Sequence, residues 1–304
     1  MSKEFPRTLL EFEQWFRTEE ACRDYLVKVR WPEGFVCTRC KGRKAWRTQK
    51  GLFHCPGCNA NVSVTAGSVF HRSKIPLRLW FRAMWWMTNQ KTGVNAMGLK
   101  NLLGLPSYQT AWTMLHKLRR AMVRPGRGKL EGEVEVDETL LGGLRRGNPS
   151  RLAKNIVIIA AEIQGKETGR IRAARIPHAR GSSIVDFVEK NVAKGATVIS
   201  DGAWAYRWLE EMGYGYRRLP LLGKDRDAGA KLLPRVHRIA ALLKRWVLGT
   251  YQGRVSAHQL DHYLAEFIFR FNRRKSATRG QLFYRLVQQC VGNPPSPYRG
   301  MIRA

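Results

Sequence analysis

Residues 133–139, EVEVDET, alternate apolar and acidic side chains, which is the pattern of a half-buried β-strand. Further strands are expected downstream in the apolar run NIVIIAAEI, the alternating stretch GRIRAARI and the short ATVISD, at residues 155–163, 169–176 and 196–201. Stretches with helical character follow or separate them, at residues 181–192, 204–213, 234–247 and 256–271. Strands interspersed with helices predict an α/β domain, which we expect to span residues 126–304.

Two of these strands end in an aspartate. Asp137 follows Val136, and Asp201 follows the run Val198–Ser200. A two-metal phosphoryl-transfer site needs such carboxylates from neighbouring strands, because their oxygens hold two divalent ions ~3.5–4 Å apart. An aspartate after a strand also caps turns, and for each acid alone this interpretation stays open. In a chain with few acids, two of them on apolar strands favour a metal-dependent site.

Three smaller parts are expected before the α/β domain: N-terminal helices over residues 1–30, a zinc ribbon over 31–70 and a helical region over 71–125. The ribbon is predicted from two C-x2-C pairs separated by 14 residues, formed by Cys37, Cys40, Cys55 and Cys58. Structural Zn²⁺ takes four tetrahedral ligands and favours thiolates, and without a secretion signal this spacing favours metal over disulfides. We therefore expect one zinc ion that stabilises a segment with little core of its own.

A helix, a short turn and a second helix are expected within the region 71–125. The stretch VNAMGLKNLLGL at 94–105 leads into a turn, and YQTAWTMLHKLRRAM at 108–122 follows with Ser107 as its N-cap. This is the outline of a DNA-reading helix-turn-helix, although ordinary packed helix pairs share it. DNA contact is favoured by the basic tail of the second helix, which contains His116, Lys117, Arg119 and Arg120.

Charge indicates the class of partner. The chain has 54 Lys and Arg residues against 23 Asp and Glu, a formal net charge of +31. A surplus of this size favours a polyanion, and nucleic acid is the leading candidate because its phosphates accept Lys and Arg contacts. No apolar run approaches the ~20 residues of a membrane-spanning helix, and the N-terminal stretch lacks the apolar core of a signal peptide. We expect a cytoplasmic protein that binds no membrane.

Several long stretches carry a resemblance to a known family: GEVEVDETLLGG at 132–143, ISDGAWAY at 199–206, VHRIAALLKRW at 236–246 and, upstream, SYQTAWTMLHKLRRAM at 107–122. They resemble insertion-sequence transposases of the DDE superfamily, in the IS1595 family, which has an N-terminal zinc ribbon and an ISXO2-like transposase domain. The resemblance implies a ribonuclease-H-like mixed sheet core, preceded by a small zinc ribbon and a helix-turn-helix region. It also implies that Asp137 and Asp201 are the first two catalytic acids, which hold Mg²⁺ or Mn²⁺.

The third ligand of such a site is expected seven residues before a lysine on one helix. In this sequence the lysine is Lys244 and the residue at that distance is His237, a residue type that the family tolerates there. The resemblance therefore implies that His237 is a ligand of the second ion and that Lys244 contacts a DNA phosphate. Glu266 is the alternative third ligand. Leu242 stands where related sequences often have a polar residue, which leaves the activity of this copy open.

The function implied by the resemblance is that of a DNA transposase, which cleaves the 3′ ends of an insertion sequence and joins them to target DNA. Double-stranded DNA, at the element ends and at the target, would be its partner. Because two ends need two active sites, a homodimer or larger assembly would act on DNA, associated with the bacterial nucleoid. Two alternatives stay open: a catalytically decayed zinc-ribbon DNA-binding regulator, and a stand-alone ribonuclease-H-like nuclease.

Overall fold

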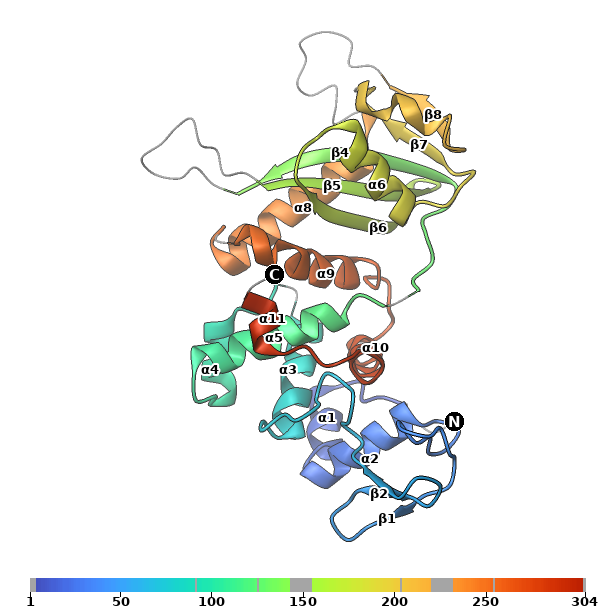
Figure 1. Cartoon of the computed structure of the whole chain (residues 1–304). Coiled ribbons are helices and arrows are strands. Elements are labelled where there is room, and N and C mark those ends of the chain that lie inside the picture. The colour runs from blue at the N-terminus through green and yellow to red at the C-terminus, as the bar shows by residue number, and fades with distance from the viewer. Residues whose placement is uncertain are drawn as a thin grey trace. The chain divides into compact units, whose positions relative to one another are not determined.

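The computed structural model describes residues 4–90, 92–124, 126–142, 155–202, 204–219, 232–253 and 255–302 (Figure 1). The chain folds as two compact units. Unit 1 combines Met1–Arg124 with Lys275–Ala304, and unit 2 is Pro125–Arg274.

Unit 1 is mainly helical. Its helices are α1 (Leu9–Trp15), α2 (Glu19–Arg30), α3 (Leu77–Asn89), α4 (Ala96–Leu103), α5 (Tyr108–Ala121), α10 (Arg279–Gly292) and α11 (Tyr298–Ile302). Between α2 and α3 lies a small antiparallel sheet in the order β1-β2-β3, formed by β1 (Trp46–Arg47), β2 (Phe53–Cys55) and β3 (Ala60–Val62). This sheet belongs to the predicted ribbon.

Helix α10 joins the two ends of the chain within unit 1. It packs against α2, α3 and α5. The ring of Phe283 lies 5.5–5.8 Å, between centroids, from four aromatic rings, those of Phe12, Phe16, Phe81 and Trp85. A Cβ atom on Gly280 would collide with the carbonyl oxygen of Pro6, so only glycine fits where α10 meets the N-terminal segment. The expected α/β domain extended to residue 304, but these aromatic contacts place α10 in unit 1.

The predicted helix pair is present in α4 and α5. The side chain of Asn95 accepts a hydrogen bond from the backbone N–H of Gly98 at 2.7 Å, and this cap begins α4. The helix ends at Gly104, whose φ of 61° lies in the left-handed region that glycine adopts without strain. Ser107 caps α5, as predicted, by accepting from the N–H of Thr110 at 3.1 Å.

Only part of the basic tail of α5 is at the surface. His116 and Arg119 are buried, and the guanidinium of Arg119 donates to the carbonyl oxygen of Val94 at 3.0 Å. The prediction that these two side chains face DNA is therefore wrong, because they occupy the packed side of the helix. Arg120 is exposed, as are Tyr108 and Gln109 at the other end of the helix.

Unit 2 is built on a mixed sheet. Its elements are β4 (Glu133–Leu141), β5 (Asn155–Gln164), β6 (Glu167–Ile176), α6 (Gly181–Asn191), β7 (Thr197–Ser200), the 3-10 helix η1 (Trp204–Leu209), β8 (Gly215–Arg218), α8 (Pro234–Tyr251), the 3-10 helix η2 (Ala257–Gln259) and α9 (Leu260–Phe271). The strand order is β6-β5-β4-β7-β8, with β4, β5 and β6 antiparallel in succession and β4, β7 and β8 parallel. Three meandering strands followed by two parallel ones form a ribonuclease-H-like sheet, which confirms the predicted fold.

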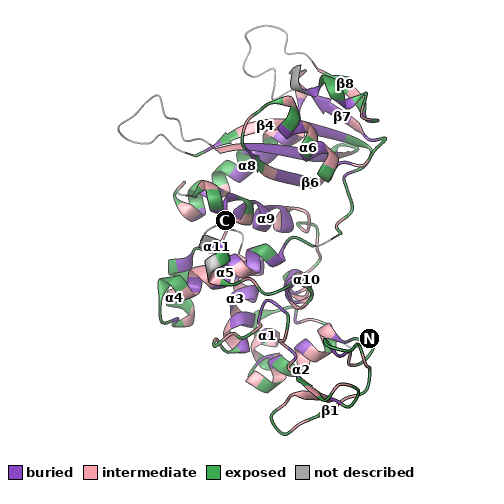
Figure 2. Cartoon of the chain, viewed as in Figure 1, coloured by how far each residue is buried: buried purple, intermediate pink, exposed green. Residues whose placement is uncertain are grey.

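Both faces of this sheet are covered (Figure 2). One apolar cluster joins the sheet to α8 and α9 and includes Ile159 and Ile199. The other joins it to α6 and η1 and includes Val134 and Val136. Because successive residues of a strand point to opposite faces, Glu135 and Asp137 of β4 lie on the α8 face.

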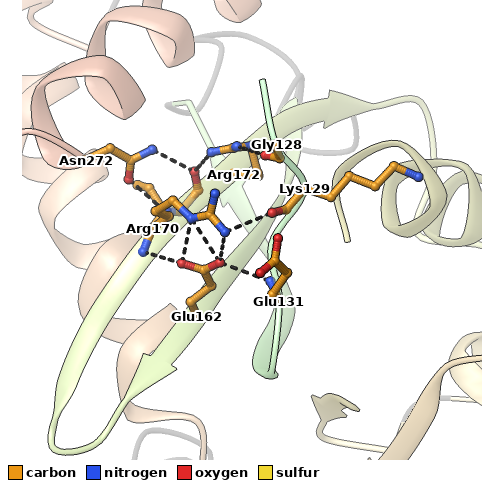
Figure 3. A network of polar contacts seen from close by, with 8 residues as sticks. Gly128, Lys129, Glu131, Glu162, Arg170, Arg172 and Asn272 are labelled. Atoms are coloured by element: carbon orange, nitrogen blue, oxygen red, sulfur yellow. Dashed lines mark hydrogen bonds and ion pairs between the residues drawn. The ribbon is translucent and has the colours of Figure 1, made fainter. Parts of the chain in front are cut away.

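Both ends of the chain of unit 2 are fixed at the β5–β6 hairpin, the N-terminal end by a buried carboxylate and the C-terminal end by an amide side chain (Figure 3). Glu162 accepts hydrogen bonds from the backbone N–H of Glu131 at 3.0 Å and from Nη2 of Arg170 at 2.6 Å. The same Nη2 atom donates to the carbonyl oxygen of Lys129 at 2.9 Å. At the other end of the unit, the side chain of Asn272 accepts from the N–H of Ile171 at 2.8 Å.

Candidate active site

The two predicted catalytic acids come from neighbouring parallel strands. Glu133 pairs with Thr197 and Glu135 with Ile199, an offset of 64 residues at both positions (197 − 133 = 199 − 135 = 64). Continued by two residues, this register places Asp137 opposite Asp201, directly beyond the end of β7. The interaction of the two carboxylates is repulsive and contributes to raising the pKa of Asp137.

Helix α8 is fixed to β4 by Glu135. This carboxylate, only 2% exposed, accepts from the backbone N–H groups of Arg235 at 2.7 Å and Val236 at 3.0 Å, in the first turn of the helix. Its other oxygen accepts from Nη1 of Arg235 at 2.9 Å. The negative charge also interacts favourably with the positive end of the helix dipole. Glu135 therefore ties the strand that contains Asp137 to the helix that contains His237.

His237 faces the first acid from this helix. Its Nε2 atom lies 3.6 Å from Oδ2 of Asp137, and its side chain is 40% exposed. Lys244 is exposed and lies seven residues further along α8, two helical turns away on the same side. The structure thus brings all four residues predicted from the resemblance, namely Asp137, Asp201, His237 and Lys244, to one side of the sheet.

The pKa of Asp137 depends on burial and on the charged groups around it. Burial raises its pKa above the ordinary value, and the nearby carboxylate of Asp201 adds to the rise. The hydrogen bond from the backbone N–H of Glu138, at 2.8 Å, and the charges of His237 and Lys244 act in the opposite direction. A carboxylate that is half-buried beside a second one is favoured in its charged form when cations lie between the two.

The donors at this site fit hard divalent cations. Carboxylate oxygens suit Mg²⁺ and Mn²⁺, and an imidazole beside them suits Mn²⁺ in particular. Asp137, Asp201 and His237 would hold such ions, whereas Lys244, as a cation, would not.

Glu266, the alternative third ligand, lies elsewhere in unit 2. It is fully buried on α9, with Oε1 3.5 Å from Nη1 of Arg270 and Oε2 3.5 Å from the hydroxyl of Tyr251. Leu242 packs against the apolar cluster between the sheet and α8. Its apolar character is therefore explained by packing, and it gives no evidence that the site has decayed.

Sequence reasoning missed a second acid on β4. Glu138 points to the opposite face from Asp137, where its Oε1 accepts from the hydroxyl of Tyr206 at 2.7 Å. Burial raises the pKa of Glu138 to about 7; the hydrogen bond from Tyr206 opposes this rise, and the nearby charges of Asp137 and Asp201 add smaller contributions to it. The signal available in the sequence was the pair of adjacent acids in VDET, since neighbours in a strand point to different faces.

The four cysteines of the ribbon form the other candidate metal centre. Their sulfur atoms all lie within 4.8 Å of one another, the closest approaches being 3.6 Å for Cys37–Cys58 and 3.5 Å for Cys40–Cys55. Hydrogen bonds from the backbone N–H groups of Cys40 and Arg39 lower the pKa of Cys37 to about 6, which favours the thiolate. Four thiolates at these distances fit a tetrahedral zinc ion, which supports the predicted structural zinc.

Two family models match the parts of the chain that contain these centres. The ISXO2-like transposase domain matches residues 129–272, and the transposase zinc-ribbon domain matches residues 17–61. A protein described as "Uncharacterized protein in transposable element ISH50", from Halobacterium salinarum, is 26% identical over 277 residues, which cover 84% of this chain and 91% of that protein. The crystal structure of the catalytic core domain of BIV integrase matches 45% of this chain and 81% of its own, with 17% identity and a TM-score of 0.29. Among the described residues, none of the helices is long and apolar enough to cross a membrane.

Proposed function

This chain belongs to the IS1595 family of transposases, and we propose that it cleaves the 3′ ends of an insertion sequence and transfers them into target DNA. The observation that carries the proposal is the meeting of Asp137, Asp201 and His237 on one side of a ribonuclease-H-like sheet. Each comes from a different element, and each offers an oxygen or nitrogen donor.

The chemistry needs no covalent protein–DNA intermediate. Two bound divalent ions, Mg²⁺ or Mn²⁺, would supply activation of the attacking water or 3′-hydroxyl and stabilisation of the leaving oxygen. Asp137 and Asp201 would hold the ions in place, and His237 would complete the set of ligands from α8. Lys244, exposed two turns further along, contacts a phosphate of the bound strand and orients it.

Recognition of DNA is assigned to unit 1. The zinc ribbon and the helix pair α4–α5 carry sequence recognition, with the exposed N-terminal end of α5 entering the major groove. Unit 2 makes mainly phosphate contacts. Because an element has two ends, the active form is a homodimer or a larger assembly on DNA.

The proposal is tested by incubating the purified full chain with candidate element ends, target DNA and Mg²⁺ or Mn²⁺, and then sequencing the products. New junctions between element ends and target DNA are expected. Cleavage without junctions would instead indicate a stand-alone nuclease, and specific binding without cleavage a DNA-binding regulator.

A further inference from the structure

One face of the zinc-ribbon sheet carries an open row of ring and amide side chains. Trp46 pairs with His54, and His54 with Asn61, across β1, β2 and β3. The indole of Trp46 packs against the imidazole of His54 in a tilted arrangement, with ring centroids 4.4 Å apart and an interplanar angle of 33°. Nδ1 of His54 lies 3.0 Å from Oδ1 of Asn61. Trp46 nevertheless stays 55% exposed, so most of its surface faces solvent.

The opposite face of this sheet is closed. Phe53 stacks on Phe35, with ring centroids 5.5 Å apart. Arg47 is held by Asp24, at 2.9 Å, and by Glu20, at 3.5 Å. Both of these acids lie on α2, and they form their ion pairs with Arg47 on the closed face of the sheet. The Trp46 face is therefore the one available to a partner.

The surroundings of this face are basic. No aspartate or glutamate occurs between Glu33 and Glu131 in the sequence. Apart from Arg47, the exposed cations within the ribbon are Arg39, Lys41, Arg43, Lys44 and Lys50. An exposed indole among cations complements a strand of nucleic acid, whose phosphates contact the cations while a base stacks on the ring.

We propose that the row Trp46–His54–Asn61 binds an unpaired stretch of DNA, with a base stacked on the exposed side of Trp46. Base faces are accessible where a duplex is open and hidden where it is paired, so an indole platform prefers an unpaired extension to a blunt duplex. The inference rests on the proposed function, which supplies DNA as the partner. It adds the DNA structure that the ribbon recognises and the side chains that do so.

The test is fluorescence anisotropy with labelled DNA, using the zinc-loaded full chain without added Mg²⁺ or Mn²⁺. Two probes are compared: a blunt 30-base-pair duplex, and the same duplex with an unpaired ten-nucleotide 3′ extension. The parent is expected to bind the extended probe about fivefold more tightly or better, which corresponds to one stacked base. Trp46→Ala should lose this preference, and Trp46→Phe should keep most of it. Trp208→Ala, which removes an exposed indole from unit 2, should leave the preference unchanged.

A purely structural role of the Trp46–His54 pair is distinguished by zinc content. If Trp46→Ala loses zinc, Trp46→Val is used to separate a structural role from base stacking. Valine retains strand propensity but offers no aromatic face. The inference is overturned if the parent binds both probes equally, or if a zinc-loaded Ala or Val variant keeps the preference. In both cases DNA binding itself would stand. A parent that binds neither probe would overturn the proposed function together with this inference.

Discussion

Glu135 and Arg235 form a buried ion pair, 2.9 Å between Oε1 and Nη1, that stands two residues before Asp137 on β4 and two residues before His237 on α8. The pair joins the strand that contains Asp137 to the helix that contains His237. The backbone N–H groups of the first turn of α8 bind the same carboxylate, so both the position and the direction of the helix depend on it.

We predict that Glu135→Ala lowers the stability of unit 2 by about 3–5 kcal/mol, because it leaves the charge of Arg235 without its buried partner. Glu135→Gln should retain an oxygen acceptor for the helix N–H groups and be milder in thermal unfolding. Its cleavage activity should still fall about 10- to 100-fold, as for other residues that orient metal ligands. Glu133→Gln is the matched control. Glu133 lies on the same strand as Glu135, but its ion pair with Arg217 of β8 is exposed. Equal activity of the parent and Glu135→Gln would contradict this role.

Asp137→Ala and Asp201→Ala should each reduce cleavage to background. DNA affinity should stay the same or rise, because each change removes a negative charge beside the path of the phosphates. Asp186→Ala, at an exposed position on α6, should behave like the parent. Gel-shift and cleavage assays on the same preparations separate binding from chemistry. Loss of binding along with cleavage would show that the acids serve folding instead.

The third-ligand assignment predicts an order of effects. His237→Ala should lower cleavage more than Lys244→Ala, because a phosphate contact positions the substrate while a ligand holds the ion. His237→Glu should regain part of the activity with Mn²⁺. Glu266→Gln removes the negative charge of the buried pair with Arg270. It should lower the thermal stability and leave the metal dependence of cleavage unchanged. An active His237→Ala beside a folded but inactive Glu266→Gln would reverse the assignment.

Zinc should be present at about one equivalent per chain and should be needed for the ribbon to fold. Chelation is expected to expose residues 31–66 to hydrogen exchange, while the sheet of unit 2 stays protected. Cys58→Ser should lower the zinc content measured by atomic absorption. Ribbon amides that stay protected in zinc-free protein would refute a folding role for the ion.

The two ends of α5 should respond differently to substitution. Gln109→Ala, at the exposed end, should cost about 1–3 kcal/mol of discrimination between element ends and random duplex. Arg119→Ala should lower thermal stability by about 1–3 kcal/mol, because the buried carbonyl of Val94 loses its donor. Competition binding and thermal unfolding measure the two effects. The opposite pattern would restore the basic tail as the DNA surface.

The strands of unit 2 were predictable because their apolar runs and alternation are strong local signals. β8 was not, because its sequence GYRR lacks that alternation and it forms an edge of the sheet. The cysteine spacing was similarly direct, since the motif places its own ligands together. Asp201 lies directly after β7, as predicted, but the prediction that Asp137 ends a strand is wrong, because β4 continues to Leu141. His237 needed the family resemblance, because one histidine on a helix carries no signal of its own.

Two features could not be derived from local patterns. Helical periodicity shows that α5 has a packed side, but it did not reveal that His116 and Arg119 lie on that side. Glu135 was counted as a polar position of a strand, and only the tertiary fold shows that the N-terminal end of α8 lies against it. The assignment of α10 to unit 1 depends likewise on contacts between residues far apart in the sequence.

The discontinuity of unit 1 has a consequence for synthesis on the ribosome. The chain of unit 2, Pro125–Arg274, is complete before α10 has been translated, whereas the aromatic core of unit 1 lacks Phe283 until then. Because domains generally fold as units during translation, unit 2 can form first and unit 1 closes last. A chain that terminates early, just after Arg274, would therefore contain every candidate catalytic residue and still lack a complete unit 1.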